Sequence, residues 1–130
     1  MSSRRLLFAQ FLVILPLAIL TWFAVAYALY WRIWWLDIPM HVFGGVWAGL
    51  CGAWILARRG HSFPLAWCLA FTLSVGVAWE VFEYTEGIAM PRYLNYPLDT
   101  AMDLAMGLVG GALGWLLATW LVGERESGML

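Results

Sequence analysis

Residues 98–122 read LDTAMDLAMGLVGGALGWLLATWLV, and this stretch indicates the class of fold. Its two carboxylates, Asp99 and Asp103, stand at the beginning, and no residue from 104 to 122 is charged. A helix of roughly 20 mostly apolar residues crosses about 30 Å of bilayer hydrocarbon. Backbone groups in lipid must be paired within the segment, so we expect this stretch to form a membrane-spanning helix.

Three further stretches share this length and apolar character: residues 6–30, 38–56 and 65–84. Short polar breaks separate the four stretches, at residues 32–37, 58–64 and 86–97. Short connections favour antiparallel neighbours. The sequence therefore predicts an all-α, polytopic membrane protein. We expect one transmembrane domain over residues 1–130, an antiparallel bundle of four transmembrane helices with a cytoplasmic tail at 123–130.

The composition of the chain favours the same class. Of the 130 residues, 64% are hydrophobic and 12% are charged, about half the charged fraction of a soluble domain. A net charge of −1 gives no basis for nucleic-acid binding. Cys51 and Cys68 lie inside apolar runs, and we interpret them as packing residues.

Arginine placement predicts the orientation in the membrane. One side of the four-span arrangement receives five arginines: Arg4, Arg5, Arg58, Arg59 and Arg125. The other side receives Arg32 and Arg92. The positive-inside rule then predicts that both termini are cytoplasmic. A signal peptide is the competing interpretation of residues 6–30, but its apolar core would be only about 7–15 residues long, so we expect this span to be retained.

Acidic residues gather at the predicted outer ends of three helices. The pairs that share a helix face are Asp37–His41, Glu80–Glu83 and Asp99–Asp103, at spacings of three or four residues. Glycines continue these faces away from the acids, at Gly45, Gly49, Gly76, Gly107 and Gly111. Small residues at this spacing let helices approach closely in lipid. We expect the glycines to form a closely packed stem of helices, with the acidic residues forming a polar opening at its outer end.

The simplest explanation of acids near helix ends is solvation or capping at the interface, which is sufficient for Asp37 and Asp99. It explains Glu80 and Asp103 poorly, because they lie a turn or more inside the helix. Six carboxylates face only two arginines on that side. Either several carboxylates are protonated or cations are bound. The expected cofactor is a divalent metal ion, one of Mg, Mn, Ca, Fe or Zn.

The predicted metal ligands are Asp37, His41, Glu80, Glu83, Asp99 and Asp103. Among them, His41 and Glu80 are the candidate catalytic groups, as ligand or general base. Arg92 is a candidate contact for an anion such as a phosphate.

The combination Asp37-x3-His41-x3-Gly45, Glu80-x2-Glu83 and Asp99-x3-Asp103 resembles the YjdF-type family of small bacterial inner-membrane proteins. It is more distantly similar to VanZ-like membrane proteins. The resemblance covers about residues 35–115. It implies a bacterial inner (plasma) membrane location and a shared membrane site at the residues of these motifs, with no assigned reaction.

Three functions remain open from the sequence. The first is a metal-dependent hydrolase acting on a lipid or a lipid-linked phosphoester. The second is a component that binds or transports cations or protons, and the third is an accessory subunit of a membrane complex. The expected partners are the lipid bilayer, a lipid-like substrate, and a second copy of the chain or another membrane protein.

Overall fold

The computed structural model describes residues 2–88 and 96–123, and within these residues it contains helices and no strand. The helices are α1 (Ser2–Ala26), α2 (Leu29–Arg32), α3 (Asp37–Ala57), α4 (Leu65–Glu86) and α5 (Tyr96–Gly123). All but α2 are long and apolar enough to cross a membrane. The predicted all-α class with four membrane-spanning helices is therefore confirmed.

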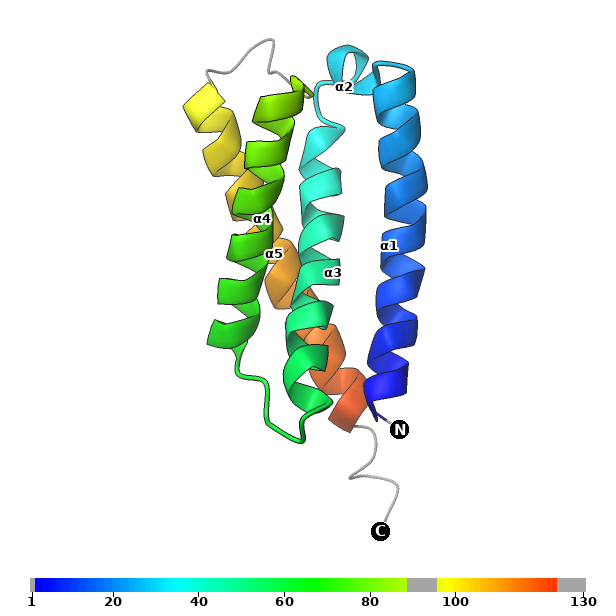
Figure 1. The fold of residues 1–130 in the computed structure, drawn as a ribbon, viewed down its shortest axis with the longest axis vertical. Coiled ribbons are helices and arrows are strands. Elements are labelled where there is room, and N and C mark those ends of the chain that lie inside the picture. Colours follow the sequence, from blue (N-terminus) through cyan, green and yellow to red (C-terminus); the bar gives the residue numbers. More distant parts are fainter. Residues whose placement is uncertain (1, 89–95, 124–130) are drawn as a thin grey trace.

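The four long helices lie side by side, and successive helices run in opposite directions (Figure 1). Helix α3 is central, since it packs extensively against α1, α4 and α5, whereas α5 contacts α1 only weakly. Helix α5 crosses α3 obliquely, and the short helix α2 lies at the end of the bundle where α1 ends (Figure 1). This arrangement brings the start of α3, the end of α4 and the start of α5 to one end of the molecule.

The first long helix ends earlier than the predicted span of 6–30. Helix α1 stops at Ala26, and Ala28 adopts a left-handed backbone with φ of 52° before α2 begins. A left-handed residue cannot continue a right-handed helix. Residues 27–30 are apolar and contain neither glycine nor proline, so hydropathy extends the helix past its true end.

The end of α4 has a conventional glycine cap. Gly87 is left-handed, with φ of 67°, and the N–H of Ile88 donates to the carbonyl of Glu83 at 3.0 Å. This is the Schellman arrangement, which closes a helix when glycine follows its last turn. The cap holds Glu83 in that last turn, near the end of the bundle.

Glycines bring α3 and α5 into backbone contact. A Cβ added at Gly45 would overlap the carbonyl of Gly107, and one added at Gly110 would overlap the carbonyl of Val42. The same contact continues where Gly49 meets Gly111. The predicted glycine stem of α3 therefore lies at this interface. Gly110 and Gly114, which the four-residue spacing did not select, pack against the same helix.

A buried glutamine side chain of α1 forms hydrogen bonds with α3. Gln10 is 7% exposed. Its Nε2 donates to the carbonyl of Leu50 at 3.5 Å, and its Oε1 accepts from the thiol of Cys51 at 2.9 Å. Cys51 is thus a hydrogen-bond donor in addition to a packing residue.

The two ends of the bundle differ in charge. Arg4 and Arg5 at the start of α1 lie at the same end as Arg58 and Arg59, which follow α3 (Figure 1). The predicted membrane orientation stays a prediction. Arg92, Arg125 and the predicted tail beyond Gly123 lie outside the described residues.

Candidate metal centre

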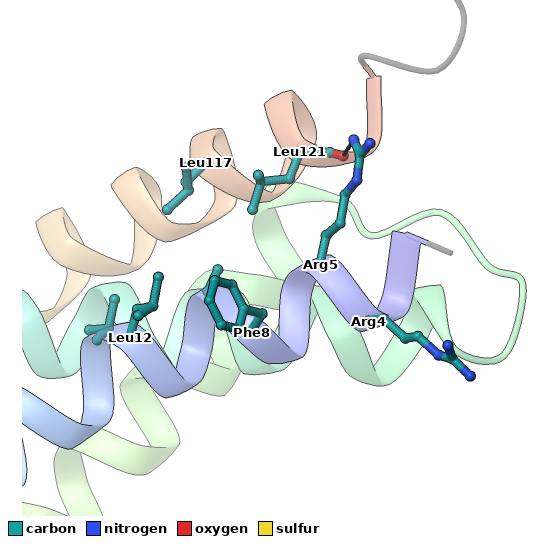
Figure 2. A pocket seen from close by; sticks show the side chains of 8 residues that line it. Arg4, Arg5, Phe8, Leu12, Leu117 and Leu121 are labelled. Carbon is teal, nitrogen blue, oxygen red and sulfur yellow. Dashed lines mark hydrogen bonds between the residues drawn. The ribbon is translucent and has the colours of Figure 1, made fainter.

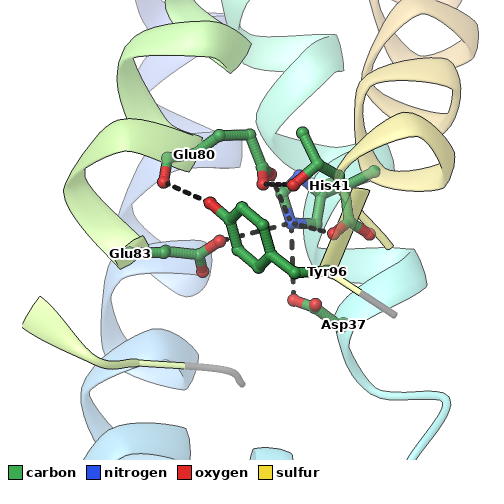
Figure 3. Close-up of polar contacts among 7 residues, drawn as sticks. Asp37, His41, Glu80, Glu83 and Tyr96 are labelled. Atoms are coloured by element: carbon green, nitrogen blue, oxygen red, sulfur yellow. Dashed lines mark hydrogen bonds and ion pairs between the residues drawn. The ribbon is translucent and has the colours of Figure 1, made fainter. Parts of the chain in front are cut away.

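His41 is the central residue of a polar cluster between three helices. It lies one turn after Asp37 in α3, on the same helix face. Glu80 and Glu83 approach it from α4, and Asp103 approaches it from α5 (Figure 3). The structure therefore brings together side chains that are up to 66 positions apart in the sequence.

Four carboxylates face the same nitrogen of His41. The Nε2 atom lies 3.4 Å from Asp37 Oδ1, 3.8 Å from Glu80 Oε1, 3.8 Å from Asp103 Oδ2 and 4.0 Å from Glu83 Oε2. All three helices of the cluster contribute at least one of these oxygens. The four distances exceed the 2.7–3.2 Å of an N–H···O hydrogen bond.

The cluster is buried. The side chain of Asp103 is 4% exposed and that of His41 is 8% exposed, while Asp37 is the most open at 18%. Five buried atoms have no hydrogen-bond partner among residues 2–88 and 96–123: Asp37 Oδ1, His41 Nε2, Glu80 Oε1, Glu83 Oε1 and Asp103 Oδ2. Buried polar atoms are ordinarily paired, and three of these unpaired oxygens, from Asp37, Glu80 and Asp103, are the ones that face His41 Nε2.

The spacing of the donor atoms suits a metal ion. Among the described residues, two groups have ligand atoms that all lie within 4.8 Å of one another: Asp37–His41–Asp103 and His41–Glu80–Glu83. Two atoms bound to one ion at about 2.0–2.2 Å are at most about 4.4 Å apart. The separations of 3.4–4.0 Å around His41 Nε2 fall inside this limit.

Two residues that the sequence analysis did not select support Glu80. The hydroxyl of Thr100 donates to Glu80 Oε2 at 3.0 Å, and the hydroxyl of Tyr96 donates to the backbone carbonyl of Glu80 at 3.4 Å (Figure 3). Thr100 orients the carboxylate and leaves Oε1 directed at His41. Its position three residues before Asp103 places both on one helix face, a spacing that could have identified it.

Asp99 belongs to neither ligand group. It lies one turn before Asp103, it is only partly buried, and it is close enough to interact electrostatically with Asp37 and His41. Of the six predicted ligands, five therefore form the cluster and Asp99 lies at its edge. The predicted anion contact, Arg92, lies outside the described residues.

Tyr30 on α2 borders the cluster. Burial raises the pKa of its phenol above the ordinary value, and the charges of Asp37 and Glu83 raise it further. The phenol therefore stays neutral across the physiological pH range. The spacing of the acidic residues does not single out Tyr30, which comes from a separate short helix.

The fold and the cluster together define a small multi-pass membrane protein with a buried His–carboxylate centre near one end of the bundle. The chain belongs to a family described as "Predicted membrane protein (DUF2238)", whose family model matches residues 4–124. This is the YjdF-type family that the motifs resemble. The match includes every residue of the cluster, while the VanZ-like similarity stays a prediction. No curated protein and no solved structure matches the chain.

Proposed function

We propose that the cluster binds one divalent metal ion between α3, α4 and α5. The observation that carries the proposal is the convergence of three buried, unpaired carboxylate oxygens, from Asp37, Glu80 and Asp103, on His41 Nε2, which is itself buried and unpaired. An ion at their centre would satisfy the nitrogen and several oxygens at once. It would also offset negative charge that neighbouring carboxylates accumulate in a low dielectric.

An ion pair without a metal fits this geometry less well. A protonated His41 has one N–H at Nε2, and only Asp37, at 3.4 Å, lies close enough to pair with it, which leaves the oxygens of Glu80 and Asp103 at 3.8 Å without a donor. A neutral imidazole would leave the carboxylates without a cation among the described residues of the cluster. Metal binding accounts for the burial and for the long separations together.

The donor set narrows the choice of metal. One imidazole nitrogen with carboxylate oxygens suits Mn²⁺, Fe²⁺ or Zn²⁺, since Mg²⁺ and Ca²⁺ prefer oxygen-only sites. A single Nε2 atom binds one ion, so the expected stoichiometry is one per chain. The group Asp37–His41–Asp103 is the preferred ligand set, because Asp37 is the most exposed member of the cluster and opens it to substrate.

The bound ion would serve hydrolysis of a lipid or lipid-linked phosphoester. Asp37 opens α3 and Glu83 lies in the last turn of α4, so the cluster is near the level of lipid phosphates. A divalent ion supplies Lewis acidity to a phosphoryl oxygen and to water. Glu80, oriented by Thr100, accepts a proton from the water. The water oxygen would bond to phosphorus as the P–O bond to the lipid leaving group breaks, and Glu80 would return its proton to that leaving oxygen, which belongs to an alcohol in a monoester and to a lipid phosphate in a diphosphate.

Metal analysis tests the binding proposal. Detergent-purified protein is stripped with a chelator, reloaded separately with Mn²⁺, Fe²⁺ or Zn²⁺, and analysed for metal after gel filtration. Wild type is expected to retain about one ion per chain, and His41→Ala and Asp103→Asn are expected to lose it. Glu86→Gln is the matched control, because Glu86 is an exposed carboxylate on α4. Absence of stoichiometric metal in wild type, or its retention in His41→Ala, would contradict the proposal.

Hydrolysis is tested separately from binding. Vesicles containing phosphatidic acid or a polyprenyl diphosphate are incubated with metal-loaded protein, and released phosphate is measured. Release is expected to depend on metal and to fall sharply in Glu80→Gln while that variant keeps its ion. Metal retention with unchanged phosphate release would remove Glu80 as the base, and no release from either substrate would remove the hydrolase.

Cation or proton transport is the second candidate, because buried carboxylates in membranes often line ion paths. The glycine contact of α3 with α5, at Gly45 and Gly49, closes the bundle below the cluster in the described part of the chain. Transport would therefore require a path between copies. Proton or cation flux into liposomes that stops in Glu80→Gln and Asp103→Asn would favour this function over hydrolysis.

A further inference from the structure

The cluster is most open beside Asp37. The side chain of Asp37 is 18% exposed, whereas those of the other four members are at most 8% exposed. The groove of about 550 Å³ between α1 and α5 does not reach the centre, because its lining residues, among them Phe8 and Leu117, lie at the opposite end of the bundle (Figure 2). We therefore expect a substrate to approach the ion from the side of Asp37.

Tyr30 lies on this open side. It belongs to α2, and its side chain packs against a small core group that includes Leu36 and Met40. These two residues directly precede Asp37 and His41 in the chain. Asp37 is also close enough to the phenol to interact with it electrostatically. The hydroxyl of Tyr30 is therefore a polar group from outside α3, α4 and α5 that borders the entrance to the cluster.

The phenol keeps a hydrogen that it can donate to a substrate. Tyr30 shares a hydrogen bond with the side chain of Thr21 on α1, while Asp37 and Glu83, within the described residues, act on it through charge. A hydroxyl has one hydrogen to donate and two lone pairs that accept. Thr21 can donate to the phenolic oxygen, which leaves the phenolic hydrogen for another acceptor. Because the phenol stays neutral across the physiological pH range, this hydrogen is present throughout that range.

A neutral donor suits this position. When ionised, the four carboxylates that face His41 carry more negative charge than one divalent ion neutralises, so they repel an anionic phosphoryl group. An O–H group that donates to a phosphoryl oxygen offsets part of this repulsion. It adds no positive charge that would compete with the ion for the carboxylates. Hydrogen bonds to ionised oxygens are also stronger than those between neutral groups.

We propose that the hydroxyl of Tyr30 donates a hydrogen bond to a phosphoryl oxygen of the substrate, beside Asp37 at the open side of the metal centre. The inference rests on the proposed hydrolase and adds a substrate-binding residue to it. Tyr30 neither holds the ion nor transfers a proton. It binds and orients the phosphoryl group while Glu80 acts on the water.

Tyr30→Phe tests the inference, because it removes the hydroxyl and keeps the ring that packs beside Leu36 and Met40. Metal-loaded, detergent-purified protein is titrated with inorganic phosphate in a calorimeter, and hydrolysis of phosphatidic acid in vesicles gives kcat/KM. The variant is expected to keep its ion and its unfolding temperature. Its phosphate affinity and kcat/KM are expected to fall at least about tenfold, the value of a hydrogen bond to a charged acceptor. Tyr27→Phe is the matched control, because Tyr27 is an exposed tyrosine just before α2.

The outcomes separate this inference from the hydrolase itself. Wild-type phosphate affinity and kcat/KM in Tyr30→Phe would overturn the inference and leave the hydrolase standing. Loss of the ion in Tyr30→Phe, or an equal effect of Tyr27→Phe, would also overturn it, since the hydroxyl would then not act on the substrate. Phosphate binding that depends on Tyr30, without hydrolysis by wild type, would remove the hydrolase and retain the phosphoryl contact.

Discussion

The substitution Gly110→Ala links the packing of the bundle to the chemistry of the metal centre. A Cβ at this position would overlap the backbone carbonyl of Val42, which follows His41 in α3. Backbone cannot move aside as a flexible side chain can. The two helices must therefore separate locally, and overpacking of this kind costs about 1–3 kcal/mol.

The separation has a calculable effect on the site. Asp103 lies about two turns before Gly110 on α5, and its Oδ2 is 3.8 Å from His41 Nε2. If the helices part by about 1 Å, this distance becomes about 4.8 Å, which exceeds the roughly 4.4 Å limit for two atoms on one ion. Gly110→Ala is thus expected to reduce metal affinity as well as stability, although the residue touches no ligand.

Thermal unfolding in detergent and metal titration measure the two effects. Gly44→Ala is the matched control, because a Cβ at Gly44 would meet only Leu17 Cδ2, at an ordinary contact distance of 3.9 Å. We expect Gly44→Ala to behave as wild type in both assays. Wild-type unfolding and metal affinity in Gly110→Ala would refute the reasoning, since the α3–α5 contact would then not determine the position of Asp103.

Three further substitutions test individual contacts. Thr100→Val removes the hydroxyl that orients Glu80 and is expected to lower hydrolysis 10–100-fold while the ion is kept. Thr119→Val should leave hydrolysis unchanged, because that hydroxyl donates to a carbonyl within α5; equal effects of the two substitutions would contradict a supporting role for Thr100. Asp99→Asn is expected to lower metal affinity far less than Asp103→Asn in the same titration, and the reverse order would place the ligand at 99. Gln10→Leu should lower the free energy of unfolding by about 0.6 kcal/mol, the mean for a hydrogen bond between membrane helices; a loss of several kcal/mol would assign Gln10 a larger role.

The sequence predicts the fold class well because hydropathy measures what the bilayer requires. The predicted spans 38–56 and 65–84 match α3 and α4 to within two residues at each end. The error at the end of α1 has a different origin. The turn at Ala28 depends on a left-handed backbone in an apolar stretch, and tertiary packing of α2 selects it without a local signal.

The site could be predicted in part from spacing on single helices. Asp37 and His41 share a face at four residues, and the structure places both in the cluster. For the pair Asp99–Asp103 the same spacing gives one member in the cluster and one at its edge, although the drift of about 40° per four residues is the same for both pairs. Which member of the pair faces α3 depends on the α3–α5 crossing, and one sequence does not specify a crossing angle.

The glycines show why the acids are not needed to hold the bundle together. The closest approach of α3 and α5 occurs at Gly45, Gly49 and Gly110, where backbone meets backbone without any charged group. A charged side chain in a membrane helix costs about 2.5–3.5 kcal/mol at the bilayer centre and less toward the ends. Four carboxylates facing one imidazole therefore add an unfavourable contribution to an interface that already packs. Such a group is consistent with binding a cation, since a bound cation would offset the charge of the carboxylates that makes this contribution unfavourable.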